Sequence, residues 1–214
     1  MRSSSILNIV LAMALVFICA RVAMADNKQG DVSAMDNAVV NNIMTRASVR
    51  SYTDKKVERE KIETLVRAAM AAPTAMNKQP WHFIVVTDEQ VLGQIAELTP
   101  NAAMAVSAPL AIVVCGDLDK AAKDVNKDFW IQDVSAATEN ILLAAHGLGL
   151  GAVWTGTWPR VERCEKIAKL LNLPETMIAF ATVVIGYPDG EQHAKDKYLE
   201  ENVSYNTYGG KMQK

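Results

Sequence analysis

Apolar residues recur along most of the chain, either at the three- and four-residue steps of a helix or in the short runs of a buried strand. The helical period predicts helices over 36–45, 58–72, 89–98, 129–148 and 160–171. Continuous apolar runs predict strands over 81–87, 109–115, 151–154 and 178–187. Because helices and strands alternate without an internal repeat, we predict one α+β domain with a central sheet.

The helix expected over 129–148 is the longest, and apolar residues recur along one of its faces. The stripe consists of Ile131, Val134, Thr138, Ile141, Ala145 and Leu148. A stripe of this length can face a protein core or a second subunit. By contrast, the tail from Pro188 contains lysines and tyrosines without an apolar period, and such a segment is stable only if it docks on another surface.

The first 25 residues have the pattern of a secretory signal peptide. Arg2 supplies a positive charge, residues 6–19 are almost all apolar, and the Ala-Met-Ala sequence at 23–25 is a small–any–small cleavage site. The apolar run is shorter than the roughly 20 residues that span a bilayer, which favours cleavage over the alternative of an uncleaved membrane anchor. We therefore expect a signal peptide over 1–25, a linker over 26–35 and a single domain over 36–214.

Cleavage of this leader predicts an exported, periplasmic protein without stable insertion in a membrane. If the leader is not used, the protein stays in the cytoplasm. No twin-arginine pair is present, so the chain would be exported unfolded and would acquire any cofactor outside the cytoplasm.

Composition excludes several classes of protein. Of the 214 residues 50% are hydrophobic and the formal net charge is −2, so the chain can bury a core and has no general attraction for nucleic acid. The three cysteines, Cys19, Cys115 and Cys164, lack the spacing of a metal site or a redox pair. We expect Cys115 and Cys164 to be buried free thiols, with a disulfide between them as the alternative in an exported protein.

Motifs that resemble catalytic or nucleotide-binding signatures lack the required surroundings. The glycines of 147–151 follow a predicted helix and precede a strand, which is the reverse of a dinucleotide fingerprint. We interpret them as a helix cap and a tight turn. His82, His146 and His193 lie in unrelated contexts and are expected to be structural or exposed. The sequence thus predicts neither a catalytic triad nor a metal site.

Three separated segments carry groups suited to a planar, anionic ligand. Arg46, Ser48 and Arg50 place two guanidinium groups and a hydroxyl within five residues, where the helical pattern stops, and the planar fork of arginine suits phosphate oxygens. A solvated surface turn explains this cluster equally well. Residues 72–83 join a helix to a strand through two prolines and two amide side chains. Residues 154–158 end a strand with a glycine, where a ligand can approach the backbone closely.

Together these segments resemble the nitroreductase-like family of FMN-dependent NAD(P)H oxidoreductases. The resemblance covers nearly all of the chain after the leader and rests on residues 46–50, 73–83, 140–156 and 185–188. Its most specific part is Asn77 before the Gln-Pro-Trp sequence at 79–81. The resemblance implies an α+β sandwich with a mainly antiparallel sheet flanked by helices. It also implies an intertwined homodimer, with FMN at each subunit interface and an arm from about residue 188 that wraps the partner.

The resemblance also assigns residues to the two ends of the cofactor. Arg46 and Ser48 would hold the FMN phosphate, with Ala47 between them. Lys197 would complete the phosphate site at a place where family members often have arginine. Arg50 would lie near N1 and the C2 carbonyl of the ring, and Asn101 would reach its pyrimidine end.

The remaining assignments line the ring and the ribityl chain. Those from the helix–strand connection, mostly contributed by the partner subunit, are Pro73, Thr74, Ala75, Met76 and Asn77. Thr155 and Gly156, next to Trp154, would meet the N5 edge of the ring through backbone groups.

The implied activity is a two-electron oxidoreduction. The chain would take hydride from NAD(P)H and reduce nitroaromatic, quinone or related acceptors by a ping-pong mechanism, with flavin N5 rather than a side chain carrying the chemistry. A reductive dehalogenase or flavin-consuming enzyme is an alternative within the fold, but residues 116–128 are short for the lid of such enzymes. Two further alternatives are an exported FMN-binding or carrier protein without nicotinamide-driven turnover, and a dimeric interaction protein that has lost the cofactor.

Overall fold

The computed structural model describes residues 37–212. The chain divides between residues 41 and 42; α2 spans this division, and the other elements described below belong to the part that follows it. The α-helices are α2 (Ala38–Thr45), α3 (Arg59–Met70), α4 (Glu89–Leu98), α5 (Phe129–Gly147) and α6 (Val161–Leu170). The strands are β1 (Trp81–Val86), β2 (Leu110–Asp117), β3 (Gly151–Gly156) and β4 (Met177–Gly186). Short 3-10 helices are η2 (Ala75–Asn77), η3 (Pro100–Ser107), η4 (Asp124–Asn126) and η5 (Glu200–Asn202).

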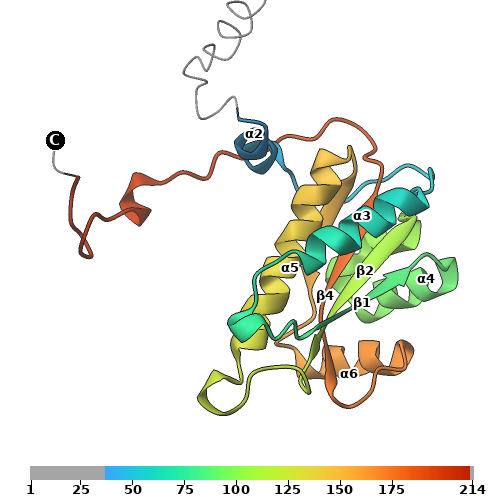
Figure 1. Ribbon diagram of the computed structural model, residues 1–214. Coiled ribbons are helices and arrows are strands. Elements are labelled where there is room, and N and C mark those ends of the chain that lie inside the picture. Colours follow the sequence, from blue (N-terminus) through green and yellow to red (C-terminus); the bar gives the residue numbers. More distant parts are fainter. Residues whose placement is uncertain (1–36, 213–214) are drawn as a thin grey trace, which may run out of the picture. The chain divides into compact units, whose positions relative to one another are not determined.

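The four strands form one sheet in the order β1-β2-β4-β3 (Figure 1). All three neighbouring pairs are antiparallel, with Phe83 opposite Val114, Val113 opposite Thr182, and Thr155 opposite Thr182. This confirms the predicted α+β fold with an antiparallel sheet. β1 and β3 are the two outer strands, so each has one side without a partner strand from the described residues.

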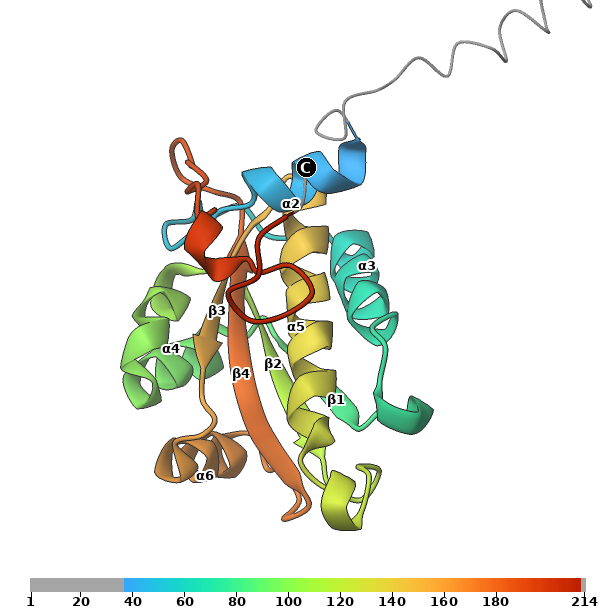
Figure 2. The ribbon, with the colours of Figure 1, turned by 90° about the vertical axis from the view of Figure 1, so that its left-hand side faces the viewer.

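Helices cover both faces of the sheet (Figure 2). Successive residues of β2 point to opposite faces, so Ile112 and Val114 join one core while Val113 and Cys115 join the other. The first core includes buried residues of α3 and α5, and the second includes buried residues of α4 and α6. The apolar stripe predicted for the longest helix is therefore confirmed for α5, whose buried residues Val134, Ile141 and Ala145 belong to the first core.

The glycine-rich stretch after α5 forms a helix end and a turn, as expected. The Leu148 amide donates to the Ala144 carbonyl, and Gly149 takes a φ of 73°, which is accessible to glycine at little cost. Gly151 then begins β3 directly under Val49, where an added Cβ would lie 2.7 Å from the valine side chain. The turn thus brings the chain back beside residues 46–50.

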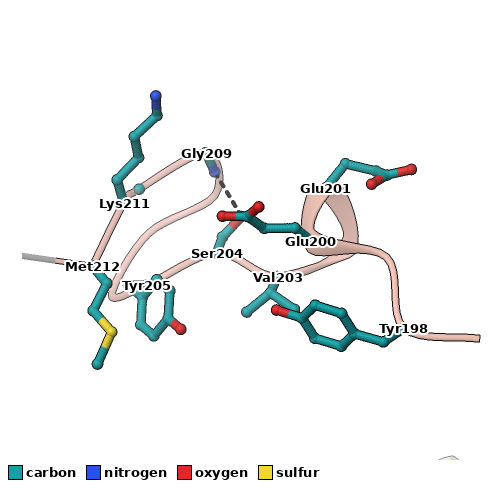
Figure 3. A pocket seen from close by; sticks show the side chains of 10 residues that line it. Tyr198, Glu200, Glu201, Val203, Ser204, Tyr205, Gly209, Lys211 and Met212 are labelled. Carbon is teal, nitrogen blue, oxygen red and sulfur yellow. Dashed lines mark hydrogen bonds between the residues drawn. The ribbon is translucent and has the colours of Figure 1, made fainter.

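Beyond β4 the chain leaves the sheet as an exposed arm. The Asp189 amide donates to the Ser51 carbonyl, but in the described part of the arm each hydrogen bond of residues 190–212 is with another residue of that segment. Figure 3 shows residues 198–212 folded around a hollow of about 730 Å³ lined by arm residues, with the Gly209 amide donating to Ser204 Oγ at 3.0 Å. The expected leader (1–25) and linker (26–35) lie outside the described residues.

Within residues 37–212, no helix combines the length and apolarity needed to cross a membrane.

Cys115 on β2 and Cys164 on α6 are buried free thiols, as the sequence predicts. Burial raises the pKa of the Cys115 thiol to about 12 and raises that of Cys164 as well. Because the thiolate is the reactive form, we expect neither to be alkylated by iodoacetamide at about pH 8 in the native protein, and both to be alkylated after unfolding. Mass-spectrometric peptide mapping measures this. Equal labelling of Cys115 in native and unfolded protein would contradict its burial.

Candidate active site

Residues 46–50 lie along the open side of the outer strand β3. The Val49 amide donates to the Ala152 carbonyl at 3.0 Å, and Ser48 forms a parallel bridge with Ala152. The Tyr52 hydroxyl lies 2.6 Å from the Val49 carbonyl and 3.0 Å from that of Val184, so it ties the segment to β4 as well. Ser48 and Arg50 are exposed while Val49 is buried between them. The backbone is fixed, and the polar side chains face outward.

Arg46 is the most enclosed cation of this segment. Its guanidinium Nε lies 3.5 Å from Glu139 Oε1 on α5, and its side chain is 18% exposed. It lines a cavity of about 230 Å³ together with Ala47, His146 and Gln192. Arg50 is exposed, and its Nη1 makes a long 3.5 Å contact with the Ser48 carbonyl. The segment beside β3 therefore carries two guanidinium groups and a hydroxyl, the kinds of donor that bind phosphate oxygens.

The backbone of β3 provides donors farther along the same edge. The Ala152 carbonyl points to the open side, so alternation along the strand places the amides of Trp154 and Gly156 on that side too. Gly156 is exposed, and a Cβ added to it would meet nothing closer than 3.7 Å, so a ligand can approach its backbone closely. Thr155 differs, because it pairs with Thr182 of β4 and its hydroxyl donates to the Thr182 carbonyl at 2.7 Å. Of the two residues expected at the ring edge, Gly156 has backbone groups that face outward, as does the neighbouring Trp154, whereas those of Thr155 face β4.

An aromatic cluster fixes this end of β3. The ring centroids of Trp154 and Phe180 are 5.7 Å apart, those of Phe180 and Trp130 are 6.1 Å apart, and those of Trp130 and Trp158 are 5.5 Å apart. All three contacts are edge-on, a favourable arrangement of aromatic rings. Because Trp130 belongs to α5, the cluster holds the end of the strand against the start of that helix.

Residues 73–79 form a tightly bent loop with an exposed surface. Met76, Asn77 and Gln79 have φ angles of 51°, 53° and 50°, in the left-handed region that non-glycine residues rarely adopt. Thr74 Oγ1 accepts from the Gln79 amide at 3.1 Å, and Asn77 Oδ1 accepts from Gln79 Nε2 at 2.9 Å. Such clusters of strained backbone occur preferentially where a protein binds a ligand.

A single chain does not bring all the predicted residues together. The loop that follows α3 and the outer strand β3 lie on opposite sides of α5 in Figure 2. Asn101 is exposed on η3, which packs against α4, and Lys197 is exposed in the arm. Residues 46–50 and 154–156 thus share the edge of β3, and residues 73–77 lie on another surface of the same chain.

Three residues that the sequence analysis did not single out hold residues 46–50 and the 73–79 loop in place. Glu139 pairs with Arg46, Asp133 on α5 accepts a hydrogen bond from the 73–79 loop, and Tyr52 anchors residues 46–50. Asp133 could have been identified from the sequence, because it lies on the same helix face as the buried residues Trp130, Val134 and Ala137. A carboxylate on an apolar stripe is a signal of a specific partner.

The three histidines lie on separate segments of the chain. His82 is exposed on β1, His146 Nε2 lies 2.9 Å from Thr45 Oγ1, and His193 lies 3.8 Å from Glu191 in the arm. Among the described residues, no group of three or more histidine, cysteine, aspartate or glutamate side chains is placed to hold a metal ion.

The sequence model of one protein family matches most of the described chain. The model described as "Nitroreductase family" aligns with residues 43–106 and 97–187. The chain belongs to the nitroreductase family. The family that the sequence resembles is therefore confirmed, and the matched residues include both the segment at β3 and the 73–79 loop.

Similar nitroreductase-family proteins are found in archaea and bacteria. A putative NADH dehydrogenase/NAD(P)H nitroreductase of Methanothermobacter thermautotrophicus is 44% identical over 174 residues, which are 81% of this chain and 88% of that protein. An FMN reductase [NAD(P)H] of Bacillus subtilis is 27% identical, covering 79% of this chain and 73% of that protein.

Solved structures of the same family have the same fold. A putative NADH dehydrogenase/NAD(P)H nitroreductase from Parabacteroides distasonis superposes with a TM-score of 0.76 at 42% identity, over 80% of this chain and 99% of that one. The NADPH:FMN oxidoreductase of Vibrio harveyi, solved with NAD+, gives a TM-score of 0.72 at 25% identity, over 79% of this chain and 77% of that one.

Proposed function

We propose that this chain is an FMN-dependent oxidoreductase that takes hydride from NAD(P)H and reduces small-molecule acceptors. The observation that carries the proposal is the edge of β3, where residues 46–50, with two guanidinium groups and a hydroxyl, lie beside Ala152 of the same strand that ends at the exposed Gly156. The names of the relatives, which include NAD(P)H nitroreductase and FMN reductase, support the same cofactor and reductant.

The residues at this edge fit a flavin mononucleotide. The four steps from Ala152 to Gly156 span about 13 Å of strand, so an anion site at one end and a backbone donor at the other suit an extended mononucleotide. Arg46 and Ser48 would hold the phosphate, and Arg50 would lie beside the ring. The Gly156 amide would donate to the ring edge. FMN supplies the redox chemistry when bound, and these residues bind and orient it.

We propose that a second copy of the chain completes the site. The 73–79 loop and the β3 edge lie apart in one chain, although the family resemblance assigns both to one cofactor (Figure 2). The arm also exposes Tyr198, Leu199 and Tyr208. An intertwined homodimer would bury these side chains, bring the partner's loop to the β3 edge and place Lys197 near the phosphate. The mass of the protein in solution, measured by light scattering, tests this proposal, which predicts the mass of two chains.

Nitroaromatic compounds and quinones are the proposed acceptors, reduced by a ping-pong mechanism. The experiment is anaerobic addition of NADPH, or of NADH, to the purified flavin-loaded protein. We expect the visible flavin bands to bleach and to return when nitrofurazone or menadione is added. Steady-state rates at several acceptor concentrations should give parallel double-reciprocal lines. Bands that persist with both nicotinamides would overturn the proposal and favour an FMN-binding or carrier protein.

We further propose that residues 1–25 direct export of the protein and are then removed. The small–any–small sequence at 23–25 supports this proposal. Mass spectrometry of the protein recovered from the periplasm of an expressing bacterium should show a chain that begins at Asp26. A chain beginning at Met1 in the cytoplasmic fraction would contradict it. An exported enzyme would have to receive its hydride, from NAD(P)H or from another donor, outside the cytoplasm.

A further inference from the structure

Asp133 is a carboxylate buried on the inner side of α5. Its side chain is 5% exposed and lies on a helix face whose other buried members are Trp130, Val134 and Ala137. Burial raises the pKa of this carboxyl group, and the amide of Ala75 opposes the rise. An apolar residue would fit such a position at lower cost, so the presence of a carboxylate needs a specific reason.

Its partner is the strained loop of the candidate site. The Ala75 amide donates to Asp133 Oδ1 at 2.8 Å, linking two segments 58 positions apart in the sequence. Ala75 immediately precedes Met76 and Asn77, both in the left-handed region. Each such non-glycine residue costs about 1–2 kcal/mol of backbone strain, so contacts from elsewhere must stabilise the bend.

We propose that Asp133 is a positioning residue for the flavin site. By accepting the Ala75 hydrogen bond, its carboxylate oxygen sets residues 74–77 in the conformation that contacts the cofactor. The inference rests on the proposed function. It extends that function by assigning a role to a residue of α5 that would itself touch neither cofactor nor substrate.

Asp117 provides a matched control within the same chain. It is also 5% exposed, and its Oδ1 likewise accepts from a backbone amide, that of Asp119 at 3.1 Å. It is the last residue of β2, opposite Met177 of β4, where no cofactor contact is expected. Asp117 Oδ2 also pairs with Lys120 Nζ at 2.8 Å, so Asp117→Leu removes more carboxylate contacts than Asp133→Leu does. A positioning role, by contrast, belongs to Asp133 alone.

The test compares Asp133→Leu, Asp133→Asn and Asp117→Leu in the full-length protein. The FMN Kd is measured by flavin fluorescence, thermal unfolding is followed without FMN, and hydrogen exchange is measured for residues 73–81. Loss of a hydrogen bond to a charged group predicts about a tenfold higher Kd for Asp133→Leu. Asp133→Asn keeps an oxygen acceptor in place and should restore the wild-type Kd to within about twofold.

Hydrogen exchange distinguishes a change in the loop's conformation from a change in the stability of the whole protein. We expect the Ala75 amide to exchange faster in Asp133→Leu than in Asp133→Asn or Asp117→Leu, at temperatures well below unfolding. Should Asp133→Leu not fold, Asp133→Ala takes its place. Equal Kd and equal Ala75 exchange in the two leucine variants would overturn the inference while leaving the proposed function intact. A wild-type protein that binds no FMN would instead overturn the proposed function, and this inference with it.

Discussion

Replacing Arg46 by alanine is expected to raise the Kd of FMN by about ten- to a hundredfold, a loss of about 1.5–3 kcal/mol, which is the usual contribution of a hydrogen bond to a charged group. Arg46 is partly enclosed, at 18% exposure, so solvent screens its charge less than that of exposed Arg50. The measurement is a fluorescence titration with FMN. Riboflavin, which has no phosphate, should bind both proteins with similar affinity.

Two further variants make the Arg46 result specific. Glu139 holds the Arg46 guanidinium at 3.5 Å, so Glu139→Gln should lower the Kd of FMN by releasing that cation for the phosphate. Arg59 pairs with Glu63 at 2.9 Å on the exposed side of α3, so Arg59→Ala removes the same charge far from β3 and should leave the Kd unchanged. Equal Kd values for Arg46→Ala and Arg59→Ala would contradict the phosphate assignment.

Replacing Gly151 by alanine is expected to lower the free energy of unfolding by about 1–3 kcal/mol and to weaken FMN binding as well. A Cβ at this position would lie 2.7–2.8 Å from three side-chain atoms of Val49, which is itself buried. Relief of this clash requires Val49 to move, and its amide is the one that ties residues 46–50 to Ala152. Urea unfolding and FMN titration measure the two effects.

Gly93→Ala is the matched control for this prediction. Gly93 lies within α4, and a Cβ there would meet nothing within 4 Å. Alanine favours a helix more than glycine does, so this variant should be as stable as the wild type or more stable by about 0.4–1 kcal/mol. Its Kd for FMN should not change. If Gly151→Ala behaved like Gly93→Ala, the contact between β3 and residues 46–50 would be wrong.

The regular elements could be predicted from the sequence because their signals are local. α4 covers the predicted residues, and Asp88 before it accepts from the Val91 amide as an N-cap does. β2 instead continues two residues past Cys115, because Gly116 and Asp117 pair with Ile178 and Met177. Neither residue has strand propensity, so only the partner strand explains the extension.

Two other segments had no local signal. η3 was not predicted, because residues 100–107 are mostly small and have no helical apolar period. The left-handed conformations of Met76, Asn77 and Gln79 were also not predictable, since that stretch lacks glycine. Its bend depends on hydrogen bonds formed in the folded chain, one of them donated by the Ala75 amide to the distant carboxylate of Asp133.

The candidate site likewise has features that the local sequence predicts and features that depend on tertiary contacts. Arginine and hydroxyl types pointed to residues 46–50, but their attachment to β3 through Val49 and Tyr52 depends on tertiary contacts. The alternation of β3 separates Gly156, whose amide faces outward, from Thr155, which is bonded to β4. Sequence similarity identified the segments, and the strand geometry distinguishes the residues within them.

The most direct test of the account is a titration of the purified, flavin-free protein with FMN, followed by flavin fluorescence and the visible spectrum. The account predicts saturable binding of one FMN per chain, with riboflavin bound at least about tenfold more weakly because it lacks the phosphate contacts of Arg46 and Ser48. Absence of FMN binding, or equal affinity for FMN and riboflavin, would contradict the assignment of the β3 edge as the flavin site.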